Sequence, residues 1–219
     1  MNIYKLRLIV TFTLFALFLS TVQSQENKNQ IPQFLFPQFS KGILKMKNGS
    51  TLSAVINYNM VDQEFIFEQR GSYLALEKPD EIDTVVWQGK KFIYLNKAFI
   101  ELAYKGKISI FYQHKAKYTS AGSKSAYGMT SQTTGPTAVL TVQGGNQMRS
   151  LDLPENVTIS LDDIFWVQEN GAFRKFTSER QFAKLFPDKE AQIRQFCKSN
   201  KINLSKVDDL QKLGELINK

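Results

Sequence analysis

Hydrophobic and polar residues alternate in short runs over most of the chain after residue 42, which is the period-2 pattern of half-buried β-strands. The pattern is clearest on either side of Asn48-Gly49, a dipeptide that tolerates positive φ at both positions of a type I′ turn, so a hairpin is predicted there. Further strands are predicted at residues 64–69, 73–77, 84–88, 92–96, 99–104, 108–118, 137–143, 157–161, 164–168 and 172–176.

From Ser178 onward the hydrophobic period changes to that of helices. Ser178 and Gln181 form a capping box at the start of a first short helix. Pro187 ends that helix, and Asp188 is expected to cap the second. Ser205 is expected to start the third, which carries a single apolar stripe.

These elements predict the α+β fold class: an antiparallel β-meander curled as a roll or partial barrel over residues 42–177, followed by short amphipathic helices over residues 178–219. Residues 25–41 are rich in Gln and Asn and are expected to form a tether. The phenylalanines of this tether either pack onto the sheet or form an exposed adhesive segment. Packing is favoured, because exposed aromatic side chains promote aggregation. Residues 119–136 are expected to form a long loop.

Residues 1–24 have the pattern of a secretory signal peptide. Basic residues precede an apolar run over residues 8–19, and Val22 and Ser24 occupy the small-residue positions before an expected cleavage at Gln25. The alternative is an uncleaved anchor helix, but no basic residue directly follows the apolar run. We therefore expect an exported protein, periplasmic or extracellular, with no membrane span after cleavage.

The formal net charge of the chain is +8 at pH 7. In an exported protein such a charge meets anionic envelope glycans and lipids first, so either of these, or another envelope protein, is the expected partner. The alternative is a solvated basic surface with no dedicated partner. No nucleic-acid recognition motif accompanies the charge, so nucleic acid is not expected as a partner. The single cysteine, Cys197, excludes an intramolecular disulfide, and its helical spacing from Ile193 and Phe196 favours a place in the core over a reactive thiol.

Three phrases over residues 42–117 carry a resemblance to known proteins: LKMKNGSTLSAVINYNMVDQEFIF, PDEIDTVVWQGKKFIYL and FIELAYKGKISIFYQHKAK. Together with the C-terminal phrase FAKLFPDKEAQIRQFCKSNKINLSKVDDLQKLGELI, this order resembles a family of uncharacterised exported proteins common in Bacteroidota. The resemblance implies export and a β-rich body, and it assigns no residue a role.

No arrangement of residues predicts catalysis or cofactor binding. His114 is the only histidine, and no Gly-x-Ser-x-Gly motif presents a nucleophile to it, so a structural histidine at the end of a strand is expected. One histidine and one cysteine cannot supply the usual ligands of a zinc site. Asp162-Asp163 lies between two predicted strands and is interpreted as a turn, not as a catalytic carboxylate pair.

The candidate binding surface is basic and aromatic and lies at the end of the 108–118 strand and in the loop that follows it. Strand alternation places Lys115 and Lys117 on one face, and lysines and tyrosine rings suit anions and sugars. The alternative is a strand edge that lysines protect against pairing with other sheets. The residues assigned to a possible anion or glycan site are Lys115, Lys117, Lys124, Tyr118 and Tyr127.

The function expected from the sequence is therefore that of an envelope-associated, non-enzymatic binding or interaction protein. The alternative is an envelope enzyme that acts on glycan or peptide. No cofactor or metal is assigned.

Overall fold

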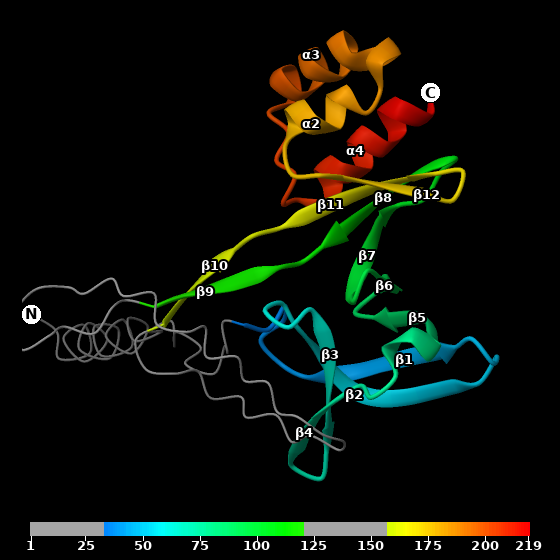
Figure 1. Ribbon diagram of the computed structural model, residues 1–219, viewed down its shortest axis with the longest axis vertical. Helices are drawn as coiled ribbons and strands as arrows, with labels where there is room; N and C mark the ends of the chain where they lie inside the picture. The colour runs from blue at the N-terminus through cyan, green and yellow to red at the C-terminus, as the bar shows by residue number, and fades with distance from the viewer. Residues whose placement is uncertain (1–32, 121–156) are drawn as a thin grey trace, which may run out of the picture. The chain divides into compact units, whose positions relative to one another are not determined.

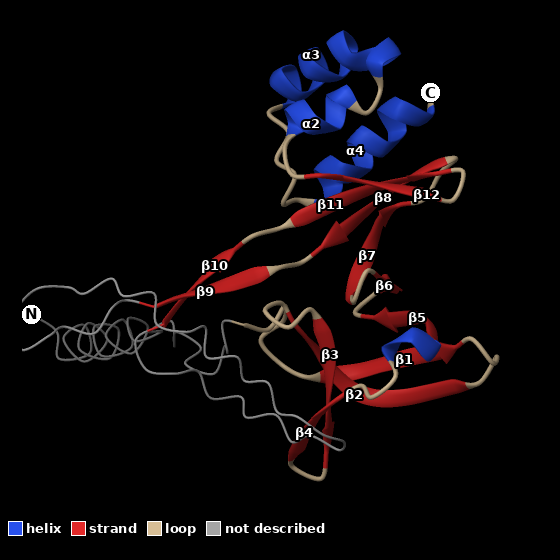
Figure 2. Cartoon of the chain, in the orientation of Figure 1, coloured by secondary structure: helices blue, strands red, loops and turns tan. Residues whose placement is uncertain are grey.

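The computed structural model describes residues 33–120 and 157–219 of the chain (Figure 1). It combines antiparallel β-strands with a few helices near the C-terminus, which confirms the predicted α+β class (Figure 2). The predicted strand at 137–143 and the signal segment at 1–24 lie outside the described residues. None of the helices within the described ranges is long and apolar enough to span a membrane.

Ten strands form one antiparallel sheet in the order β12-β11-β8-β7-β6-β5-β1-β2-β3-β4, and β9 and β10 form a separate two-stranded ribbon. Most strands pair with their neighbours in the sequence, as expected of a meander; the exceptions are the pairings of β1 with β5 and of β8 with β11. The strands are β1 (Ser40–Met46), β2 (Thr51–Asn59), β3 (Glu64–Gln69), β4 (Ser72–Ala75), β5 (Ile82–Trp87), β6 (Lys90–Leu95), β7 (Ala98–Tyr104), β8 (Ile108–Gln113), β9 (Ala116–Ser120), β10 (Val157–Leu161), β11 (Ile164–Glu169) and β12 (Ala172–Phe176).

The predicted 108–118 strand is two strands, because the chain leaves the sheet at His114 and Lys115. Asp162 and Asp163 form the matching break between β10 and β11, and the N–H of Asp162 donates to the carbonyl of Lys115 at 2.8 Å. The interpretation of Asp162-Asp163 as a turn is therefore wrong. The two residues join β10 to β11. Figure 1 shows that the ribbon formed by β9 and β10 meets the sheet at this connection.

The two Asn-Gly pairs form different turns. Asn170 and Gly171 both have positive φ and join β11 to β12 through a two-residue loop, as in a type I′ turn. At the first hairpin only Gly49 has positive φ, and the N–H of Gly49 donates to the carbonyl of Met46 at 3.0 Å. The predicted type I′ turn is therefore wrong at that hairpin. Asn48 instead accepts the N–H of Ser50 at 2.9 Å, which suits a longer loop with a glycine bulge.

One face of the ten-stranded sheet carries the core. The register places Leu44, Val85, Phe92, Glu101, Tyr112, Phe165 and Phe176 in a single row that crosses seven neighbouring strands. Opposite residues of paired strands share a face, so this row is buried along its length, and Glu101 is its one charged member.

Two hydrophobic clusters lie along this face on either side of Glu101. In the first, Tyr58 and Phe65 of β2 and β3 pack against Trp87, Phe92 and Phe99 of β5 to β7. The second cluster lies over β8, β11 and β12 and is covered by the helices. These are α2 (Glu179–Lys184), α3 (Glu190–Asn200) and α4 (Val207–Asn218), with short 3₁₀ turns at Pro79–Glu81 (η1) and Pro187–Lys189 (η2).

The helix starts follow the sequence prediction only in part. Ser178 accepts the N–H of Gln181 at 3.2 Å and caps α2 as predicted. Asp188 and Ser205 do not cap the next two helices, which begin after Lys189 and Lys206 without a side-chain cap. Cys197 is buried in the helix-covered cluster, and burial raises the pKa of its thiol to about 11, so the predicted core position is confirmed.

The aromatic residues before β1 pack onto the sheet, as favoured from the sequence. Phe34 is 3% exposed and forms a bridge with Asn59 beyond the N-terminal end of β1. Phe36 contacts Trp87 edge to face, and the side-chain amide of Asn57 donates to the carbonyl of Phe36 at 2.8 Å. Residues 33–39 therefore extend the packed body of the protein.

The replacement Gly214→Ala should destabilise the protein by roughly 1–3 kcal/mol, because a Cβ at Gly214 would overlap the ring of Tyr104 where α4 lies on β7. The same substitution in a free helix would stabilise that helix by about 1 kcal/mol. A loss of stability therefore distinguishes the overlap with Tyr104 from the intrinsic helix preference. Urea unfolding measures the change in the free energy of unfolding. In a Tyr104→Ala background the added methyl should become neutral or stabilising, and an equal loss in both backgrounds would refute the overlap.

Candidate functional site

The predicted anion site is only partly within the described residues. Lys124 and Tyr127 lie outside them, and of Tyr118 only the backbone, in β9, is described. Lys115 and Lys117 are described, and both reach the same carboxylate: their Nζ atoms lie 3.3 Å and 3.8 Å from the two oxygens of Asp162. The two lysines therefore share a face, as strand alternation predicted.

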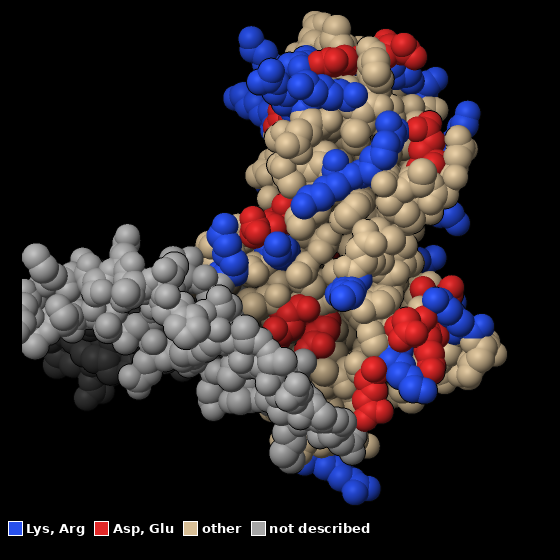
Figure 3. All heavy atoms as spheres, viewed as in Figure 1, with Lys and Arg blue, Asp and Glu red and all other residues tan. Residues whose placement is uncertain are grey.

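The ribbon formed by β9 and β10 has one polar and one apolar face. Ala116 and Ile159 contact the first hydrophobic cluster, whereas Lys117 lies opposite Ser160 on the other face. We call the face that carries Lys115, Lys117, Asp162, Ser160 and Thr158 the polar ribbon face. In Figure 3 basic and acidic side chains lie next to each other over this part of the molecule.

The charges of the polar ribbon face do not cancel. The hydrogen bond from Lys115 and the nearby charge of Lys117 hold the pKa of Asp162 below its ordinary value, so its carboxylate is ionised at neutral pH. Two ammonium groups then face one carboxylate, which leaves one positive charge. The side chain of Lys117 is 60% exposed and that of Lys115 is 32% exposed, so both remain accessible to a ligand.

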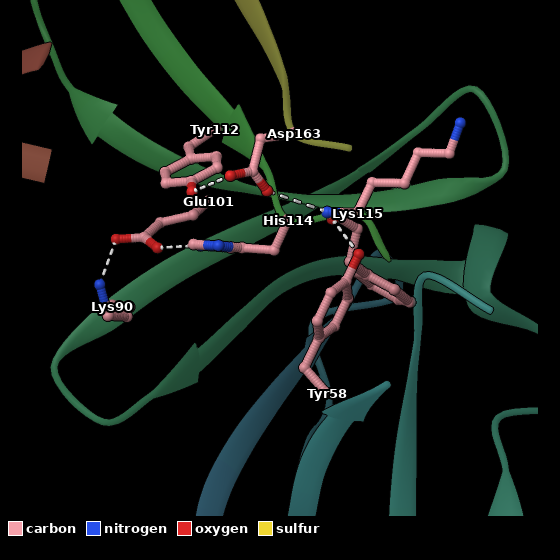
Figure 4. A network of polar contacts seen from close by, with 8 residues as sticks. Tyr58, Lys90, Glu101, Tyr112, His114, Lys115 and Asp163 are labelled. Carbon is pink, nitrogen blue, oxygen red and sulfur yellow. Dashed lines mark hydrogen bonds and ion pairs between the residues drawn. The ribbon is translucent and has the colours of Figure 1, made fainter. Parts of the chain in front are cut away.

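A second polar cluster is buried beneath the point where the ribbon leaves the sheet (Figure 4). Glu101 Oε2 lies 2.7 Å from His114 Nε2, and Glu101 Oε1 lies 2.6 Å from Lys90 Nζ. Burial on its own would raise the pKa of Glu101, but the hydrogen bonds from His114 and Lys90 outweigh it and hold that pKa below its ordinary value. Glu101 is therefore a buried carboxylate that is kept ionised by two partners.

Aromatic residues enclose His114. The ring of Tyr112 lies over the imidazole with 3.8 Å between centroids, and Tyr58 approaches it edge-on. The hydroxyl of Tyr112 donates to Asp163 at 2.7 Å; burial, followed by this contact, raises the pKa of Tyr112 above its usual range. His114 is 7% exposed, which agrees with the predicted structural histidine at the end of a strand.

Sequence reasoning missed Glu101, because local alternation gives no signal for it. Ile100, Leu102 and Tyr104 form the more apolar phase of the strand, so the pattern assigns Glu101 to the exposed face. The structure buries residues of both phases of β7. The partners of Glu101 are Lys90 of β6 and His114 beyond the end of β8, and only the register shows that they meet.

Two concave surfaces of the described residues lie elsewhere, over β1 to β4. An apolar trough of about 310 Å³ is lined by Leu44, Leu52, Ala54, Ile56, Phe67, Leu74, Ala75 and Leu76, with Glu77 as its one charged residue. An adjoining hollow shares Leu52, Ala54 and Phe67 and adds Lys41 and Glu68. Within the described ranges no cluster of His, Cys, Asp and Glu has the arrangement of a metal site.

Comparison of the chain with models of protein families, with curated proteins and with solved structures finds no match.

The replacement Glu101→Gln should destabilise the protein by about 3 kcal/mol at pH 7, because it leaves Lys90 and His114 without their shared charge. The pKa of Glu101 is lowered in the folded state, so its contribution is fully present above its unfolded pKa, near 4.5, and is lost as the pH falls through the folded pKa. We therefore expect urea unfolding between pH 7 and pH 3 to give a difference in the free energy of unfolding, between wild type and Glu101→Gln, that becomes smaller below about pH 4.5.

Glu215→Gln, at an exposed site on α4, provides the control and should follow the wild-type curve. A difference that stays constant down to pH 3 would show that the pKa of Glu101 is the same in the folded and unfolded states. A wild type that gains stability relative to Glu101→Gln as the pH falls from 7 to 4.5 would show that Glu101 is not ionised in the folded protein.

Proposed function

We propose that this chain is an exported binding protein of the bacterial envelope that holds an anionic ligand on the polar ribbon face. The observation that carries the proposal is the convergence of Lys115 and Lys117 on Asp162, which leaves one exposed positive charge in a fixed position. A phosphate, sulfate or carboxylate group suits such a set of donors.

Asp162 neutralises part of the positive charge through which the proposed site binds. Asp162 competes with the ligand for both ammonium groups, so a bound anion has to displace or share that carboxylate. Interactions of this kind between exposed charges are weak and sensitive to salt. A multivalent ligand, such as an anionic glycan or a lipid surface, suits a weak site better than a single small ion does.

The other candidate is an envelope enzyme that acts on glycan or peptide. The buried pair of His114 and Glu101 supports it, since a histidine held by a carboxylate is a common general base. The low exposure of His114 and its contacts with Tyr112 and Tyr58 favour a structural role instead. We therefore retain binding as the proposed function.

For the fold we infer the finer description expected from the sequence, a sheet curled as a roll or partial barrel, and we assign the curl to β1 to β7. The contacts of Phe65 with Trp87, Phe92 and Phe99 support it, as does the hydrogen bond from the hydroxyl of Tyr58 to the carbonyl of Phe99 at 2.9 Å. A roll of this kind has an open end at which part of its apolar face stays uncovered, and the apolar trough has that character.

Export predicts that the mature protein starts at Gln25. The intact mass of protein purified from its native host should lack residues 1–24, because signal peptidase cleaves after the small residues Val22 and Ser24. A mass that includes Met1 would refute export by cleavage and would favour an uncleaved anchor.

Binding through charge predicts opposite effects of two changes at the polar ribbon face. The double variant Lys115→Gln and Lys117→Gln should weaken binding to phosphatidylglycerol vesicles, by about 1 kcal/mol per lysine, and should elute from a dextran sulfate column at lower salt. Asp162→Asn should elute at higher salt, because it releases both lysines. Vesicles and column distinguish a lipid headgroup from a glycan.

Lys105→Gln with Lys107→Gln provides the matched control, since it removes the same charge from two exposed residues outside the polar ribbon face. If both double variants lose the same amount of binding, only the net charge of the protein determines the binding. The addition of Lys124→Gln tests whether the third lysine of the predicted site takes part. No retention of the wild type at low ionic strength would refute the proposal.

A further inference from the structure

The apolar trough lies beside an open edge of the sheet. In the strand order β4 is the last strand, and within the described ranges no strand pairs with its outer side. Both Leu74 of β4 and Leu76 just after it line the trough, so edge and trough form one surface. Leu52, on the other side of the trough, is 54% exposed although it is a large apolar residue. Exposed apolar patches next to polar residues commonly mark interaction sites.

The backbone of β4 has hydrogen-bonding groups available at this edge. A two-residue turn joins β3 to β4, and Gln69 lies opposite Ser72 at its base. In such a hairpin the residues that flank the turn form a hydrogen-bonded pair, and hydrogen-bonded and non-hydrogen-bonded pairs then alternate. Tyr73 and Ala75 therefore direct their N–H and C=O groups outward, where an added strand can pair with them.

The sequence of β4 lacks the usual protection of an edge strand. Natural edges commonly carry lysine, proline or an inward-pointing charge that prevents pairing with another chain. Residues 72–75 read Ser-Tyr-Leu-Ala and contain none of these. The strand is short, which limits pairing, but it leaves a segment suited to the addition of one more strand.

The charge around this surface is opposite to that of the whole chain. Residues 64–83 contain six acidic and two basic residues, whereas the full chain carries a net charge of +8. Glu68 and Glu77 are exposed beside the trough and its adjoining hollow, where Lys41 is the one basic lining residue. Figure 3 shows acidic side chains gathered over the part of the molecule that contains β3 and η1. A partner that fits this surface carries positive charge.

From the open edge, the trough and the acidic surroundings we propose that β4 binds an extended basic peptide segment of a partner protein by strand addition. The backbone of the segment pairs with Tyr73 and Ala75, alternate apolar side chains enter the trough beside Leu74, and basic side chains meet Glu68 and Glu77. This surface is separate from the polar ribbon face, which attracts ligands of opposite charge, so the two proposals stand or fall independently.

The probe is a fluorescent synthetic peptide of alternating valine and lysine, and fluorescence anisotropy with the mature protein measures its affinity. Two peptides of equal length provide controls. One has glutamate in place of lysine, and the other has N-methyl groups on alternate residues, which keep side chains and charge but remove backbone donors. Each control should bind at least roughly tenfold more weakly. Equal binding of all three peptides would overturn strand addition.

Two variants of the protein test the contribution of exposed residues beside β4, and neither replaces a buried core residue. Glu68→Lys with Glu77→Lys should weaken the basic peptide at least roughly tenfold and improve the acidic one. Leu52→Asn should weaken both, whereas Leu161→Asn, which replaces the 62% exposed leucine of β10, should leave both unchanged. Unchanged affinity in Leu52→Asn would place the peptide elsewhere and refute the proposal.

The trough has other potential occupants that the experiment also detects. Self-association in analytical ultracentrifugation that Leu52→Asn abolishes would show that a second copy covers the trough, and it would overturn the proposal. Absence of measurable binding of the valine–lysine peptide to the wild type at low ionic strength would overturn it as well.

Discussion

Glu101 is a buried carboxylate in a row of aromatic and aliphatic residues, and the packing of the protein around it depends on keeping that charge satisfied. An isolated ionised carboxylate in such a place would cost several kcal/mol, so both of its oxygens need hydrogen-bond partners. Lys90 supplies one from the neighbouring strand β6, and His114 supplies the other from just beyond the end of β8. The chain leaves the sheet at His114, where other backbone partners take over: the N–H of Phe99 in β7 donates to the carbonyl of Gln63 at 3.3 Å, and the N–H of Ala116 donates to the carbonyl of Met60 at 2.9 Å.

The same carboxylate marks the boundary between the two hydrophobic clusters, which are covered by different means. Strands β2 and β3 cover one cluster, and the C-terminal helices cover the other. The helical cover is fixed by specific contacts of α4: Asn218 pairs with both backbone groups of Ile108, and Gly214 lets the ring of Tyr104 lie on the backbone of α4. A polar boundary between two dry clusters favours a single alignment of the sheet, because any shift in register would leave the carboxylate unpaired.

Local sequence signals predicted most strands and the α+β class, because alternation acts over a few residues. They failed at the predicted strand over residues 108–118, which breaks where Phe99 and Ala116 donate to Gln63 and Met60, residues far away in the sequence. At residues 48–49 a local contact decided the outcome, because Asn48 binds Ser50 and the loop carries a glycine bulge. Alternation correctly placed Lys115 and Lys117 together, but Asp162, which pairs with both, lies between two strands far away in the sequence. Glu101 carried no local signal either, because Ile100 and Leu102 make the other phase of its strand the more apolar one.

The two surfaces proposed for binding have opposite charge, which the net charge of +8 conceals. Salt at physiological strength screens charges beyond about 8 Å, so a ligand responds to the few groups near its own site and not to the whole protein. At the polar ribbon face those groups are two lysines that share one carboxylate, and beside β4 they are mainly acidic. A basic exported protein can therefore hold an anionic envelope ligand at one site and a basic polypeptide at another. Strand addition supplies affinity that is independent of charge, so the acidic surroundings of β4 select among extended partners and do not have to hold them.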